Sequence, residues 1–274
     1  MHLYTTCDLT FEITVPTPFV LMLRPRSGAQ QWIVSEKYTI IPREAVSEFT
    51  DTFGNLCQRL IAPAGIFSIH TGAEIILADS VDRARDAPFV EIQNLPDEVL
   101  LYLLPSRYCE TEHFGQMATA ITEGQLPGYN QVAAIEAWVR NNIRFESRGD
   151  DSPVSATEVN SRKWGVCRDL SHLAIALCRS LSIPARMVVG YLYGLQPMDL
   201  HAWFEAYLAG RWYTFDATQI EVKGGYVVLG YGRDAADVAV YNQFGPAAYP
   251  TQQKVSVKRI DDEPPQAMVE RHEV

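Results

Sequence analysis

The sequence lacks the features that mark membrane, nucleic-acid-binding and extracellular proteins. No apolar run is long enough to span a membrane, and residues 1–8 do not combine a basic start with an apolar core. The net charge is −10 and no basic block occurs, so neither nucleic acid nor a membrane is an expected partner. The five cysteines are scattered and odd in number, unlike a disulfide framework. We therefore expect no signal peptide and a cytoplasmic protein, whose reducing surroundings preserve a reactive thiol.

Metal-binding patterns are also missing. Neither a Cys-x-x-Cys nor a His-x-x-x-His spacing occurs, so we expect no metal site and no cofactor. The length of 274 residues, with 47% hydrophobic residues, allows one large domain or two modest ones. The oligomeric state stays open.

The first part of the chain, residues 1–105, is predicted to be a β-rich domain. Apolar and polar residues alternate, as in strands, over three stretches: 10–15, parts of 31–41 and parts of 65–77. Between the last two, the segment Asp51-Thr52-Phe53-Gly54-Asn55 predicts a turn.

Pro96 and Pro105 mark the predicted boundary with a second domain, residues 106–260. The patterns there predict helices near 112–122 and over 129–143, a capping box at Ser155–Glu158 that opens another short helix, and strands at 183–193, 226–229 and 253–257. Residues 261–274 form a charged, proline-containing tail that we expect to be mobile.

Cys167 is predicted to lie at the start of a helix. Gly165 breaks the chain just before it, and Pro184 ends the helix. Between them the apolar residues recur at helical spacing, at Leu170, Leu173, Ala174, Leu177, Cys178 and Leu181. Free backbone N–H groups and the positive end of the helix favour the thiolate of Cys167, and one such N–H could donate to an oxyanion.

A hairpin is predicted to follow, with Ala209-Gly210 as its two-residue turn. This register gives three cross-strand pairs: Leu208–Arg211, Trp203–Asp216 and His201–Thr218. His201 and Asp216 then lie on one face as diagonal neighbours, roughly 7–8 Å apart at the backbone. A slip by one residue would send them to opposite faces. The other face suits burial, because it carries Ala202, Phe204, Ala206, Leu208, Tyr213, Phe215 and Ala217.

A thiol, an imidazole and a carboxylate in this order are the groups that nucleophilic acyl transfer requires. His201 would take the proton of Cys167, and Asp216 would orient the imidazole and stabilise its charged form. The thiolate would attack a carboxamide or peptide carbonyl to form a thioester. Water or an amine would then resolve it.

Several stretches resemble those of bacterial transglutaminase-like proteins, a group that includes proposed cysteine proteases. The matching stretches are 165–173, 176–179, 183–186, 201–208, 211–218, 232–238 and, more weakly, 51–55. The resemblance implies an α+β fold, in which a papain-like, transglutaminase-like core follows an N-terminal β-rich domain. It also implies a catalytic triad of Cys167, His201 and Asp216. Leu170 and Ser171 depart mildly from the family pattern, outside the triad.

Further residues near the motifs have both a functional and a structural interpretation. Trp164 and Trp203 could wall the substrate cleft or simply pack. Glu205 shares the predicted face of His201 and could support the triad or lie at the rim.

Charged residues next to the motifs are open to the same two interpretations. Arg233 and Asp234 could line the substrate groove or anchor a loop. Arg168 and Asp169 are expected to pair at the helix start. His172 lies about 140° around the helix from the nucleophile, so we expect it to cap or pack.

Three functions remain open from the sequence. The first is a cysteine protease or amidase that acts on a peptide or protein substrate. The second is a transglutaminase, which transfers the acyl group to an amine and needs a groove that excludes water. The third is a non-catalytic scaffold for binding proteins, which the family also contains. Hydrolysis ranks first, because the triad is intact and the sequence shows no such groove.

Overall fold

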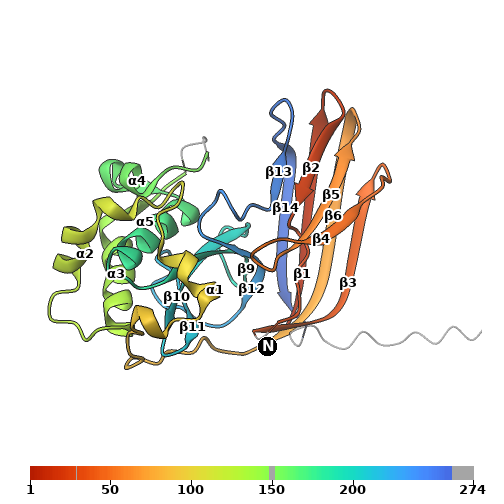
Figure 1. Ribbon diagram of the computed structural model, residues 1–274. Coiled ribbons are helices and arrows are strands. Elements are labelled where there is room, and N and C mark those ends of the chain that lie inside the picture. Colours follow the sequence, from red (N-terminus) through yellow and green to blue (C-terminus); the bar gives the residue numbers. More distant parts are fainter. Residues whose placement is uncertain (29, 148–151, 261–274) are drawn as a thin grey trace, which may run out of the picture.

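The computed structural model describes residues 1–28, 30–147 and 152–260. Two sheets form a sandwich on one side of the molecule, and a third sheet lies between this sandwich and a group of helices (Figure 1). The predicted mobile tail, residues 261–274, lies outside the described residues.

The sandwich contains strands from both ends of the chain. One sheet has the order β14 (Pro250–Arg259), β1 (His2–Ile13), β6 (Gly65–Leu77) and β3 (Gln31–Ile41). The other has the order β13 (Tyr241–Gln243), β2 (Thr17–Leu21), β5 (Leu56–Ala62) and β4 (Ser47–Thr50). The sequence-based division placed residues 241–259 in the second domain, whereas β13 pairs with β2 and β14 pairs with β1. The sandwich is therefore completed by a late part of the chain, which local patterns do not reveal.

The third sheet is antiparallel, with the order β11 (Arg211–Phe215), β10 (His201–Leu208), β9 (Ala185–Leu192) and β12 (Tyr226–Gly232). Helix α5 (Cys167–Ser180) packs against one face. That face carries the apolar residues predicted to be buried: Ala202, Phe204, Ala206, Leu208, Tyr213, Phe215 and Ala217. Hydrophobic burial thus holds the helix of the thiol against the hairpin of the imidazole.

Of the other helices, α2 (Gly115–Ile121), α3 (Tyr129–Asn142) and α4 (Ala156–Arg162) pack against α5, and α1 (Asp97–Leu100) packs against Tyr207 of β10 (Figure 1). Helices α2 and α3 match predicted helices, and Ser155 caps α4 as predicted, because its Oγ accepts from the N–H of Glu158 at 3.4 Å. A short parallel pair, β7 (Arg144–Phe145) and β8 (Trp164–Gly165), precedes α5. Within the described residues, no helix has both the length and the apolar character needed to cross a bilayer.

The third sheet also contributes to the core of the sandwich. Tyr191 of β9, together with Val227 and Leu229 of β12, is buried among the apolar residues of the sandwich. The sandwich and the third sheet therefore share a core.

The predicted turn at residues 51–55 is present, because the N–H of Asp51 donates to the carbonyl of Asn55 at 3.1 Å.

Candidate active site

Cys167 is the first residue of α5, as predicted, and its side chain is partly exposed. The carboxylate of Asp169, two residues on, fixes the start of the helix. It accepts hydrogen bonds from the N–H of Val166 at 3.2 Å and from the guanidinium groups of Arg162 and Arg168 at 2.9 and 3.2 Å. The predicted pairing of Arg168 with Asp169 is thus confirmed.

The hairpin of β10 and β11 has the predicted register. The observed pairs run from Leu208–Arg211 to Phe204–Phe215. Ala209 and Gly210 have φ values of +48° and +83°, as a two-residue type I′ turn requires. Because β11 ends at Phe215, the two predicted pairs beyond it are not part of the ladder. The turn and the alternating pattern together fix which side chains share a face.

His201 and Asp216 meet as the register predicts. Nε2 of His201 lies 2.7 Å from Oδ2 of Asp216, and the two residues are 3% and 0% exposed. Burial alone would lower the pKa of His201, but the charge and hydrogen bond of Asp216, helped by a hydrogen bond with the Cys167 side chain, raise it to about 10. Since Nε2 binds the carboxylate, Nδ1 is the nitrogen left for the thiol.

The carboxylate of Asp216 is hydrogen bonded on both oxygens. Oδ2 also accepts from the hydroxyl of Tyr226 at 3.0 Å, and Oδ1 accepts from the N–H and hydroxyl of Thr218 at 2.9 and 2.7 Å. Burial alone would raise the pKa of Asp216, but the charge of His201 and these donors hold it below its usual value. Asp216 is therefore an anion in the folded protein.

Two partners of Asp216 were not identified from the sequence. Tyr226 opens β12, and its position at the start of a predicted strand was the only sign of it. Glu136 of α3 accepts the backbone N–H of Asp216 at 2.8 Å and pairs with Arg140 at 3.2 Å. Burial raises the pKa of Glu136, which follows the buried Ile135 in the predicted helix. The one feature of the sequence that could have identified Glu136 is an acidic residue at a helix position expected to be buried.

The two tryptophans have different environments. Trp203 is only 1% exposed, and its ring stacks on that of His201 with 6.0 Å between centroids. Gly190 lies opposite His201 on β9, and a Cβ added there would lie 1.9 Å from the carbonyl oxygen of Val227 and 3.0 Å from the Trp203 ring. Trp203 therefore packs beside the imidazole.

Trp164 is half-buried, three residues before Cys167, and the guanidinium of Arg162 lies 3.9 Å from its ring centroid.

Glu205 is fully buried, so it does not lie at the rim of a cleft. Nε and Nη2 of Arg186 donate to its Oε2 at 2.8 and 2.6 Å, and Gln30 donates to its Oε1 at 3.0 Å. The guanidinium of Arg186 lies 4.2 Å from the ring centroid of Trp212 and 3.8 Å from that of Tyr231. Glu205 thus belongs to a buried ion pair.

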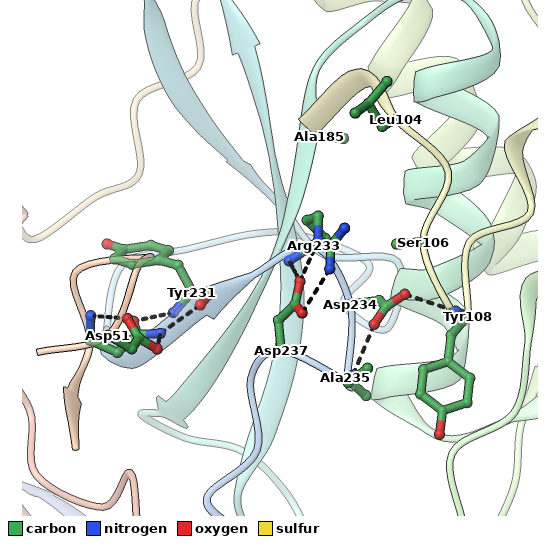
Figure 2. Close-up of polar contacts among 12 residues, drawn as sticks. Asp51, Leu104, Ser106, Tyr108, Ala185, Tyr231, Arg233, Asp234, Ala235 and Asp237 are labelled. Carbon is green, nitrogen blue, oxygen red and sulfur yellow. Dashed lines mark hydrogen bonds and ion pairs between the residues drawn. The ribbon is translucent and has the colours of Figure 1, made fainter. Parts of the chain in front are cut away.

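Arg233 and Asp234 anchor loops, the structural alternative for this pair (Figure 2). Arg233 donates to the carboxylate of Asp237 at 2.6 and 3.1 Å. Asp234 is fully buried and accepts from the N–H groups of Tyr108 and Ala236 at 2.7 and 2.8 Å.

The nearby Arg179 on α5 is 3% exposed, and its side chain is hydrogen bonded to several of these loops. Its guanidinium donates to the carbonyls of Ala185, Leu104 and Arg233 and to the hydroxyl of Ser106, at 2.7–3.0 Å. Burial lowers its pKa. The loops that carry these acceptors are tied to the helix that carries Cys167.

His172 packs inside the protein, as predicted. Its Nδ1 lies 2.9 Å from the carbonyl of Val154, its Nε2 accepts from the N–H of Ala235 at 3.2 Å, and its ring stacks on Tyr108. Burial lowers the pKa of His172 to about 4, so it is neutral in the folded protein near pH 7.

The four other cysteines are buried. Burial raises the pKa of Cys57 to about 11, raises that of Cys7 and Cys109 to about 12, and raises that of Cys178 as well. Cys167 is therefore the accessible thiol. In the described ranges, no group of three or more His, Cys, Asp or Glu side chains is placed to hold a metal ion. The lack of a cofactor stays a prediction.

Comparison with known proteins identifies the family of the chain. The bacterial transglutaminase-like N-terminal region matches residues 14–74, and the transglutaminase-like superfamily matches residues 115–217. A crystal structure from Cytophaga hutchinsonii, named a putative cysteine protease, is 34% identical with a TM-score of 0.88, and the match covers 96% of this chain and 92% of that chain. The chain belongs to the transglutaminase-like superfamily. The predicted α+β fold with a papain-like core is thereby confirmed.

The matched core of this transglutaminase-like protein contains Cys167, His201 and Asp216 and ends one residue after the aspartate. An uncharacterized protein of Mycobacterium leprae is also similar, at 26% identity over 235 residues, which is 79% of this chain and 82% of that protein. The family membership suggests an enzyme, and its reaction has to be argued from the site.

Proposed function

We propose that this transglutaminase-like protein is a thiol-dependent acyl-transfer enzyme that hydrolyses peptide or amide bonds. The observation that carries the proposal is the buried hydrogen bond between His201 and Asp216, beside the one accessible thiol. Four sets of contacts hold these groups in place: the helix start, the hairpin register, the Trp203 stack and the donors to Asp216. Such preorganisation is what nucleophilic catalysis requires.

In the proposed mechanism, Nδ1 of His201 accepts the proton of Cys167, and Asp216 stabilises the resulting imidazolium. The thiolate attacks the carbonyl carbon, and a backbone N–H at the start of α5 donates to the oxyanion. His201 then protonates the leaving amine, the C–N bond breaks and a thioester remains. His201 takes a proton from water, the hydroxide adds to the thioester, and release of the acid restores Cys167.

Transfer of the acyl group to an amine is the second candidate, because the same thioester can be resolved by lysine. Hydrolysis in ¹⁸O-labelled water, with and without a primary amine, separates the two. Incorporation of ¹⁸O into new carboxyl groups supports hydrolysis, and amine adducts that increase with amine concentration support transfer. A peptide or protein substrate is proposed in either case.

Alkylation of the native protein tests whether the thiol is activated at all. An ordinary thiol with a pKa of about 8.5 is almost fully protonated at about pH 6 and reacts slowly with iodoacetamide. We expect rapid modification of Cys167 at this pH, located by mass spectrometry, and slow modification in His201→Ala.

His70→Ala is a matched control for this experiment. His70 also lies 2.8 Å from an aspartate, Asp8, but on the sandwich. We expect this variant to label like the wild type. Equal labelling of Cys167 in wild type and His201→Ala would contradict the proposal and favour a non-catalytic scaffold.

A further inference from the structure

We propose that Tyr226 is a positioning residue for Asp216, and that Gln31 of the sandwich holds the strand from which Tyr226 acts. The inference rests on the proposed function of the same site. It gives the N-terminal β-rich part of the chain a part in setting up the reaction.

The first step is the state of the Asp216 carboxylate. An ionised carboxylate has about four acceptor positions. Here His201 and Tyr226 occupy two on Oδ2, and the two donors of Thr218 occupy two on Oδ1. Because Asp216 is fully buried, water does not replace a lost donor without rearrangement. Loss of Tyr226 therefore frees the oxygen that binds the imidazole.

The second step is the environment of the Tyr226 hydroxyl. Its ring packs edge-on against Trp203 with 5.0 Å between centroids and lies 6.5 Å from that of His201. Burial and the negative charge of Asp216 raise the pKa of Tyr226 well above its usual value, so the hydroxyl stays a donor. Tyr226 and His201 thus hold one oxygen from two sides.

The third step is the strand of Tyr226. In the order β11–β10–β9–β12, this strand is the edge opposite to the hairpin. Its ladder with β9 shifts register between Val228 and Gly230, and the backbone groups on its outer side, as on any edge strand, need other partners. The β12 backbone near Tyr226 is therefore not held by β9 alone.

The sandwich supplies these partners. The amide of Gln31 accepts from the N–H of Val228 and donates to its carbonyl, both at 2.8 Å, as a neighbouring strand would. Asn55 makes the same pair of bonds with Tyr231 at 2.8 and 2.7 Å, and Asp51 accepts from the Asn55 amide at 2.9 Å (Figure 2). Val228 is two residues from Tyr226, so Gln31 fixes the backbone next to the hydroxyl that binds Asp216.

The test of Tyr226 measures the alkylation rate of Cys167 at about pH 6, together with the NMR signal of the proton between His201 and Asp216. We expect Tyr226→Phe to lower the rate about tenfold, as for loss of one hydrogen bond to a charged group, and to speed the exchange of that proton with solvent. Tyr213→Phe is the matched control. It removes a hydroxyl that accepts from Arg211 in the same sheet, and we expect neither effect.

The test of the sandwich uses the same two measurements on Gln31→Met, which removes both bonds to Val228. We expect a decrease of about threefold in the alkylation rate and faster proton exchange, because the backbone of Val228 loses its outer partner. Gln58→Met is the matched control, since Gln58 is a fully buried glutamine of the sandwich whose amide has no hydrogen-bond partner among the described residues. Thermal unfolding identifies any variant that fails to fold.

The outcomes separate the two proposals. If Cys167 labelling depends on His201 but is unchanged in Tyr226→Phe, the positioning role is overturned and the proposed function stands. If Tyr226→Phe has the expected effects and Gln31→Met behaves like Gln58→Met, the role of the sandwich is overturned. If wild-type labelling does not depend on His201, the proposed function itself fails.

Discussion

Asp216→Asn is expected to turn Cys167 into an ordinary thiol. The pKa of His201 is raised from 6.5 to about 10, which corresponds to about 5 kcal/mol in favour of the imidazolium. Without the carboxylate, burial is left as the main influence and disfavours the charged ring. We therefore expect a neutral imidazole near pH 7 and no stabilised ion pair with the thiolate.

The assay is the second-order rate constant for iodoacetamide modification of Cys167, measured from about pH 5 to pH 9 in both proteins. At about pH 6 we expect a decrease of at least about 100-fold in Asp216→Asn, since the triad members act as a unit. The two rates should converge above the pKa of an ordinary thiol, about 8.5. Nearly equal rates at pH 6 would refute the argument that Asp216 maintains the charge on His201.

Stability gives an independent measure of the same pair. The pKa of folded His201 lies above the unfolded value near 6.5, so the stabilisation is complete below pH 6.5 and is lost as the pH rises towards 10. Urea unfolding from pH 7 to pH 10 should therefore show a loss of up to about 4 kcal/mol in the wild type that is absent in Asp216→Asn. Parallel pH profiles in the two proteins would contradict this assignment.

Three further changes test the structure around the site. His172 has a pKa lowered to about 4, so its contribution to stability is present above pH 6.5 and is lost as the pH falls towards 4. Between pH 7 and pH 4, the free energy of unfolding in urea should fall by about 3 kcal/mol more in the wild type than in His172→Gln. Equal losses in the two proteins would count against a buried, neutral His172. Ala209→Asn should raise the free energy of unfolding by about 1 kcal/mol, because asparagine tolerates the positive φ of +48° better than alanine; a lower value in urea unfolding would show that the turn is not the source of strain. Arg179→Met should lower the free energy of unfolding by at least about 3 kcal/mol, because it leaves several buried acceptors without a donor. Wild-type stability in the same assay would show that the hydrogen bonds of Arg179 do not hold these loops.

The centre of the site was predictable because local patterns specify it. The Ala209-Gly210 turn and the alternating apolar residues fix the hairpin register, and the register brings His201 and Asp216 to one face. The apolar stripe after Cys167 likewise fixes the helix and its buried side.

The outer part of the site was not predictable, because it depends on contacts between distant segments. Tyr226 and Glu136 reach Asp216 from β12 and α3, and no periodicity links these positions. The face of Trp203 and Glu205 looked polar, yet all of β10 is buried because other segments cover it. A cytoplasmic location and the absence of nucleic-acid and membrane partners stay predictions.

The pairing of β14 with β1 has a consequence for biosynthesis. The ribosome completes β1 and β6 first, and the whole third sheet is made before β14 emerges. Until β14 emerges one edge of β1 has no partner, and until β9 and β12 emerge the shared core lacks Tyr191, Val227 and Leu229. An unpaired edge strand favours association with other chains. The nascent sandwich therefore keeps an unpaired edge until β14 is made, and its folding cannot finish before the thiol site has been synthesised.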